Sequence, residues 1–166
     1  MKVVLTVLAM VTLLAGGPSA AYAGTNDVVV VFQGNTEVNK EAYKFLRRNL
    51  SQSNVSVNMS ATQDLKSIKP GVYKAVVVLS TGLASGLDPA LVSFIQGYPD
   101  KKDIFLVNLL KGSRGTAVQV FAAAKSAAGV DTVAAASTWS EGGDKMTYIK
   151  MHQEWIADLA AFLKTK

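Results

Sequence analysis

The stretch that decides the fold is Val28-Val29-Val30-Val31-Phe32, an unbroken apolar run that is followed by Gly34-Asn35-Thr36. Four consecutive β-branched valines favour a strand, and the absence of alternation indicates a strand buried on both faces. Such strands are typical of the interior of a parallel sheet, where helices cover both sides. The run therefore predicts an α/β architecture.

Outward from this run, strand-like and helix-like patterns alternate along the chain. Further strands are predicted over residues 55–59, 75–79, 103–107 and 132–136. Helices are predicted near Val38 to Leu50, over 62–68, from Asp88 to Gly97, over 116–128 and after Asp144. These strand–helix units, with no internal repeat or linker, predict a single domain.

The second strand sets the expected strand order. Residues 55–59 alternate strictly between apolar and polar side chains, which is typical of an edge strand with one solvent-exposed face. Alternating strand–helix units form parallel sheets with right-handed crossovers. We therefore expect a three-layer α/β/α sandwich with a five-stranded parallel sheet in the order 2-1-3-4-5.

The turn after the first strand carries a more specific signal, because Gly34-Asn35-Thr36-Glu37 opens the first helix. The predicted strand order and this turn together resemble the flavodoxin-like family. The resemblance covers the chain from Asp27 to its end. In that family a loop commonly ending Gly-Asn-Thr-Glu holds the FMN phosphate at a helix N-terminus, where unpaired N–H groups and the helix dipole favour an anion. The resemblance implies an FMN-binding domain that acts in electron transfer.

The expected cofactor site lies at the carboxyl edge of the sheet, where ligands bind in open α/β folds. Trp139 follows the fifth strand and would either stack on a planar ligand or cover the core as a rim aromatic. No residue is assigned a catalytic role. The candidate cofactor contacts are Gln33, Gly34, Asn35, Thr36, Ser80, Thr81, Gly82, Lys111, Gly112, Ser113 and Trp139.

Two departures from the family pattern keep a second interpretation open. Only Gln33 stands between Phe32 and Gly34, where the family usually has several Ser or Thr residues. The loops over residues 80–86 and 110–115 contain no aromatic residue. The alternative function is therefore a degenerate flavodoxin-like domain that has lost the cofactor and serves as a binding or protein-interaction module.

The N-terminus has the composition of a signal peptide. Lys2 precedes an apolar run over residues 3–15, and Ala21-Tyr22-Ala23 matches an Ala-x-Ala cleavage site. The run is shorter than the ~20 residues that a membrane span needs. We expect cleavage after Ala23, a mature domain over residues 24–166 without a membrane span, and a periplasmic or secreted location.

Composition excludes several other classes of function. The chain contains no cysteine, which excludes disulfides, thiol redox chemistry and Cys-ligated metals. Its single histidine, His152, lies on the apolar stripe of the last predicted helix and is interpreted as a partly buried packing residue rather than as a metal ligand. The net charge of +5 is spread along the chain, so no nucleic-acid interface is predicted.

Overall fold

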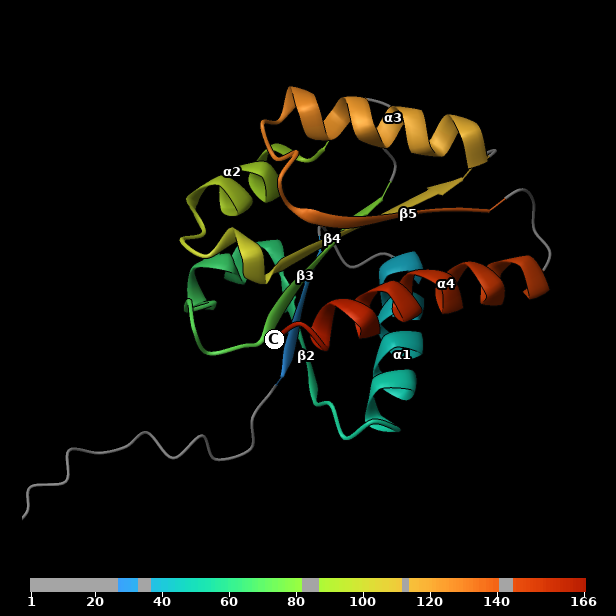
Figure 1. Ribbon diagram of the computed structural model, residues 1–166, viewed down its shortest axis with the longest axis horizontal. Coiled ribbons are helices and arrows are strands. Elements are labelled where there is room, and N and C mark those ends of the chain that lie inside the picture. The colour runs from blue at the N-terminus through green and yellow to red at the C-terminus, as the bar shows by residue number, and fades with distance from the viewer. Residues whose placement is uncertain (1–26, 33–36, 82–86, 112–113, 141–144) are drawn as a thin grey trace, which may run out of the picture.

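The computed structural model describes residues 27–32, 37–81, 87–111, 114–140 and 145–166. These residues form a five-stranded sheet in the order β2-β1-β3-β4-β5, and all neighbouring strands are parallel. Figure 1 shows helices on both sides of the sheet. The predicted α/β/α sandwich and its strand order are confirmed.

The elements alternate as expected along the chain. The strands are β1 (Val28–Phe32), β2 (Val57–Ala61), β3 (Ala75–Thr81), β4 (Ile104–Lys111) and β5 (Ala134–Ser140). The α-helices are α1 (Glu37–Ser51), α2 (Pro89–Gly97), α3 (Arg114–Ala127) and α4 (Lys145–Leu163). Two short 3₁₀ helices, η1 (Thr62–Ser67) and η3 (Lys101–Asp103), complete the described elements.

The sheet separates two hydrophobic cores. In β1 every residue is at most 2% exposed, which confirms burial on both faces. Val28, Val30 and Phe32 pack in the core beneath α1 and α4, whereas Val29 and Val31 pack in the core beneath α2 and α3 (Figure 1). Consecutive strand residues point to opposite faces, so one apolar run supplies both cores.

The strand ends differ from the predicted ones in a consistent way. β2 and β5 begin two residues later than predicted, and β3, β4 and β5 continue further, to Thr81, Lys111 and Ser140. Polar residues in these extensions favoured loops in the sequence, but ladder pairing uses backbone groups and so continues through them. The predicted loop residues Ser80, Thr81, Lys111 and Trp139 therefore belong to strands.

The edge position of β2 is confirmed, but one side chain departs from the pattern. Val57 packs against the core beneath α1 and α4. Met59, on the same face and predicted to point inward, is 48% exposed. An edge strand has a neighbour on one side only, so its apolar face is incompletely covered.

The connection between β2 and β3 contains the short helix that was predicted over residues 62–68. It is the six-residue 3₁₀ helix η1. The predicted cap of the next helix is also confirmed, because the Asp88 side chain accepts hydrogen bonds from the backbone N–H groups of Ala90 (2.9 Å) and Leu91 (3.1 Å).

A buried carboxylate ties the amino ends of three strands together. Asp27, which precedes β1, lies 2.6 Å from Lys74 Nζ and accepts a hydrogen bond from the backbone N–H of Ser56 at 3.2 Å. Burial alone would raise the pKa of the Asp27 carboxyl, but the contacts with Lys74 and Ser56 lower it below its usual value. The carboxylate thus supports the register at the amino edge of the sheet.

Candidate functional site

Some of the predicted cofactor residues lie in the described ends of β3, β4 and β5. Thr81 is paired in the ladder with Leu109, and Trp139 with Leu110. Lys111 is paired with Ser140, so β4 and β5 reach further than β3 at this edge. The backbone therefore brings three of the predicted positions, Thr81, Lys111 and Trp139, to neighbouring strand ends.

Of the remaining predicted positions, only Ser80 belongs to the described residues. Ser80 lies in β3 and is 3% exposed. The other candidates lie outside the described residues: Gln33, Gly34, Asn35, Thr36, Gly82, Gly112 and Ser113. Their role as cofactor contacts stays a prediction.

A polar row crosses the three strands just before they end. Ser80 of β3 is paired with Asn108 of β4, which is paired with Ser137 of β5. Ser80 and Asn108 follow Val78 and Leu106 by two residues, and those two side chains pack in the core beneath α2 and α3. Strand alternation therefore puts Ser80 and Asn108 on that same face.

Asn108 is the unusual member of this row. Its side chain is 0% exposed, and neither Nδ2 nor Oδ1 has a hydrogen-bond partner among the described residues. A buried amide left in this state costs about 1–3 kcal/mol for each unsatisfied group. Native proteins seldom keep such a group unless a ligand or an ordered water completes its hydrogen bonds. The amide is thus a buried polar group near the carboxyl edge whose hydrogen bonds a ligand or an ordered water would complete.

The sequence analysis missed Asn108, although a signal was present. The predicted fourth strand ended at Val107, so Asn108 fell outside it. The strand in fact continues, and Asn108 interrupts the apolar run Ile104–Leu110 as its only polar residue. One amide within an apolar strand is a buried polar group that requires a partner.

The start of α1 is the other part of the predicted site that the structure describes. Glu37 is the acidic residue in its first turn, and Lys40 Nζ lies 2.7 Å from Glu37 Oε1. The hydrogen bond from Lys40 and its positive charge hold the pKa of the exposed Glu37 carboxyl below its usual value. Lys40 thus offsets a negative charge that would otherwise repel an anion at this helix end.

His152 has the packing role that the sequence indicated, and it is fully buried rather than partly buried. Its ring stacks on Phe45 of α1 with centroids 4.9 Å apart, and its Nδ1 accepts a hydrogen bond from Trp155 Nε1 at 3.0 Å. Burial lowers the pKa of the imidazole to about 4, an effect that the charge of Glu41 only partly opposes. His152 is therefore neutral at pH 7.

Among the described residues, no group of three or more His, Asp or Glu side chains is arranged to hold a metal ion. No helix in that part of the chain combines the length and the apolar character that a membrane span requires.

Solved structures share this fold at low sequence identity. The chain matches an oxidoreductase from Corynebacterium diphtheriae with a TM-score of 0.57 and 10% identity, covering 86% of this chain and 99% of the other. A point mutant of flavodoxin from Pseudomonas aeruginosa matches with a TM-score of 0.51 and 16% identity, over 82% and 99% of the two chains.

A larger protein contains a similar domain. Rubredoxin oxygen:oxidoreductase from Desulfovibrio gigas matches with a TM-score of 0.51 and 17% identity, over 84% of this chain but only 37% of its own length. No protein-family model matches the chain, and no curated protein matches it. The comparisons, together with the strand order, show a flavodoxin-like fold.

Proposed function

We propose that this flavodoxin-like domain binds a flavin, with FMN as the first candidate, at the carboxyl edge of its sheet and acts in electron transfer. The observation that supports the proposal most directly is the buried amide of Asn108 beside that edge, which has no partner among the described residues. The likeness to a flavodoxin and to an oxidoreductase adds support at the level of the fold.

The described residues fit such a ligand in their chemistry. The Asn108 amide offers N–H donors and a carbonyl acceptor, which suits a ring system with carbonyl and N–H groups along one edge. Ser80 adds a hydroxyl in the same row. Outside what the structure describes, the turn over residues 34–36 would hold the phosphate at the start of α1, and the Trp139 side chain would stack on the ring. FMN supplies the electron transfer itself, while the protein orients the flavin and sets its surroundings.

A second function is favoured by one feature of the fold. β1 ends at Phe32 and α1 begins at Glu37, so only residues 33–36 are left to surround a phosphate. A domain that cannot hold the phosphate would serve as a cofactor-free binding or interaction module. The two functions predict different results in a titration with flavins.

The variant Asn108→Leu tests the flavin site. It is expected to weaken binding of both FMN and riboflavin by about tenfold, because a neutral but well-positioned hydrogen-bonding group is lost from a buried site. Its free energy of unfolding should stay equal or rise by about 1 kcal/mol, because an apolar side chain of similar size replaces the unpartnered amide. Flavin fluorescence quenching gives the affinities, and urea unfolding gives the stability.

Controls separate the parts of this proposal. Asn58→Leu makes the same change on the edge strand β2 and should leave flavin affinity unchanged. Gly34→Asp adds a carboxylate to the predicted phosphate turn and should weaken FMN binding but spare riboflavin. If the wild-type protein binds neither flavin at micromolar concentration, the flavin proposal is wrong and the cofactor-free module is supported.

We also propose that residues 1–23 direct export and are removed after Ala23. The charged start, the short apolar run and the Ala-x-Ala motif support this proposal. Mass spectrometry of the exported protein should then find Gly24 as the first residue. Ala23→Phe should prevent processing, because the cleavage site requires small residues. Wild-type protein that keeps Met1 outside the cytoplasm would contradict the proposal.

A further inference from the structure

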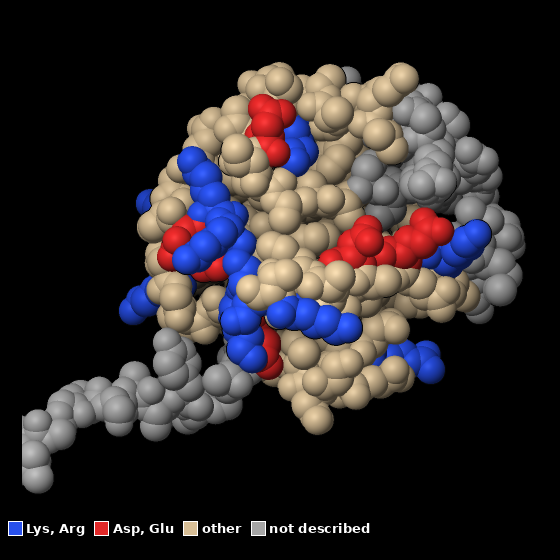
Figure 2. Space-filling view, viewed as in Figure 1, with Lys and Arg blue, Asp and Glu red and all other residues tan. Residues whose placement is uncertain are grey.

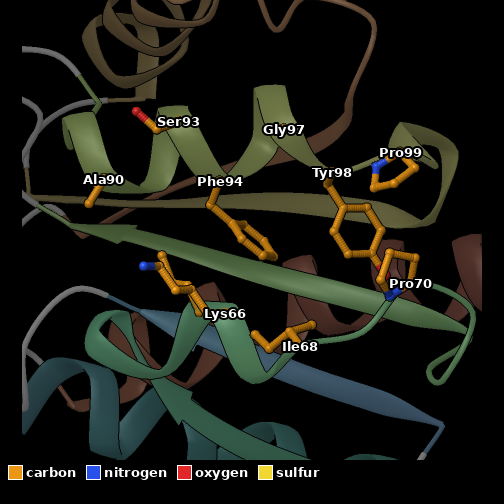
Figure 3. A pocket seen from close by; sticks show the side chains of 10 residues that line it. Lys66, Ile68, Pro70, Ala90, Ser93, Phe94, Gly97, Tyr98 and Pro99 are labelled. Carbon is orange, nitrogen blue, oxygen red and sulfur yellow. The ribbon is translucent and has the colours of Figure 1, made fainter.

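A cavity of about 590 Å³ that is open to solvent lies between η1 and α2 (Figure 3). These two elements pack on the face of the sheet opposite to α1 and α4. Leu65 and Lys66 of η1 line one side of the cavity. Its size falls in the range of pockets that bind small organic molecules.

The cavity is distinct from the carboxyl edge. Helix α2 runs from the end of β3 back toward the start of β4, so its last residue, Gly97, and the following Tyr98 lie toward the amino ends of the strands. Both residues line the cavity, and so does Pro70, which lies in the connection that leads to the start of β3. A ligand here would not occupy the proposed flavin site.

The middle of the cavity is apolar and aromatic. Phe94 and Ile68 face each other across it from the two sides (Figure 3). The Phe94 ring also packs on the Tyr98 ring at a tilt of 49°, with centroids 5.5 Å apart. Aromatic edges and faces in this arrangement favour a planar aromatic guest.

Polar groups lie at the two ends. Lys66 is exposed on η1 at one end, and Tyr98 lies at the other (Figure 3). Tyr98 is only 3% exposed, and its hydroxyl has no hydrogen-bond partner in the described part of the chain. Burial, followed by the charges of Asp103 and Asp100, raises the pKa of this hydroxyl, so it remains a donor in need of an acceptor.

We propose that this cavity binds a small aromatic anion whose acid group pairs with Lys66 and whose far end carries a hydrogen-bond acceptor for the Tyr98 hydroxyl. The aromatic body lies between Phe94 and Ile68. The exposed Pro70 ring lies beside the hydroxyl end of Tyr98 (Figure 3). The acceptor of the ligand reaches the Tyr98 hydroxyl by moving the Pro70 ring aside. Lysine selects the negative charge, and the buried hydroxyl selects the acceptor.

Two fluorescent probes test this assignment on the wild-type protein, namely naphthoate and a hydroxynaphthoate with its hydroxyl at the end far from the carboxylate. Both should bind at one saturable site, and the hydroxynaphthoate should bind about fivefold more tightly because its oxygen accepts from Tyr98. In Tyr98→Phe the two probes should bind equally. A preference that survives this substitution would contradict the role of the hydroxyl.

Further variants test the position of the site. Apart from its chain neighbours and its own helix backbone, a Cβ added at Gly97 meets no atom of the described residues within 4 Å, so Gly97→Leu should fold normally and occupy part of the cavity. It should reduce probe affinity by at least about tenfold. Lys66→Glu should weaken binding about fivefold, whereas Lys69→Glu, the same change at an exposed lysine that does not line the cavity, should not.

Several results of these binding experiments would contradict the proposed site. The proposal is overturned if the wild-type protein shows no saturable probe binding, if Gly97→Leu leaves the affinity unchanged, or if the two lysine variants behave alike. An excess of FMN should not displace either probe. Displacement by FMN would put both ligands at one site and would also overturn the proposal, whereas failure of FMN to bind at all would leave it standing.

Discussion

Trp155→Ala should lower the free energy of unfolding by about 4 kcal/mol, the largest stability effect we expect from a single truncation in this protein. Among the described residues, Trp155 is the largest fully buried side chain. It is 0% exposed and lies in the core between the sheet and helices α1 and α4. The substitution leaves a large cavity in a close-packed core. It also removes the indole N–H that donates to His152 Nδ1.

The measurement is urea unfolding followed by far-ultraviolet circular dichroism at pH 7. Phe162→Ala is the matched control, since Phe162 lies on the same helix, packs against Phe105 at 5.2 Å between ring centroids, and is only partly buried. Its loss should be about 1–2 kcal/mol. If the two truncations cost the same, Trp155 does not have the central place in the core that the structure gives it.

Acidification from pH 6.5 to pH 4 should destabilise the protein by about 3 kcal/mol through His152 alone. The pKa of this imidazole is lowered to about 4 in the fold, by burial above all, from 6.5 in the unfolded chain. Between these values the unfolded state binds the proton and the folded state does not. The contribution of neutral His152 to the free energy of unfolding is therefore fully present well above pH 6.5. It decreases as the pH falls from 6.5 to about 4 and changes little below that.

His152→Asn isolates this contribution. The Asn side-chain oxygen can occupy the position of Nδ1 and accept from Trp155, but it does not titrate. Plots of unfolding free energy against pH should therefore diverge between pH 4 and pH 6.5, with the steeper slope in the wild type. Asp27, whose pKa is lowered from 3.8, acts below this window and affects both proteins equally. Parallel plots would show that His152 titrates normally in the fold.

The fold could be predicted because its central strands are decided by burial. β1 and the first part of β3 are apolar on both faces, and only a sheet interior with helices on both sides buries such residues completely. The extensions through Ser80, Lys111 and Trp139 could not be predicted in the same way. Their pairing depends on the backbone of a neighbouring strand, which local side-chain patterns do not report.

The candidate site was predicted less completely than the fold. The rule that ligands bind at the carboxyl edge pointed to the ends of β3, β4 and β5 and to Ser80, and the role of these residues as ligand contacts stays a prediction. It did not reveal that Asn108 is fully buried, because burial of a polar group depends on what α2 and α3 cover. The cavity beside Tyr98 was also missed, since it lies between η1 and α2, and local sequence patterns do not report how far apart two elements pack.

The place of β1 between β2 and β3 makes the first described strand indispensable to the second. β2 pairs with β1, whereas β3 pairs with β1 on one side and with β4 on the other. A protease cut that released everything before residue 33 would leave β2 with no strand to join. The same cut would turn β3, a seven-residue strand whose first five residues are apolar, into an open template for intermolecular pairing. Truncated forms of this kind should therefore precipitate rather than survive as smaller domains.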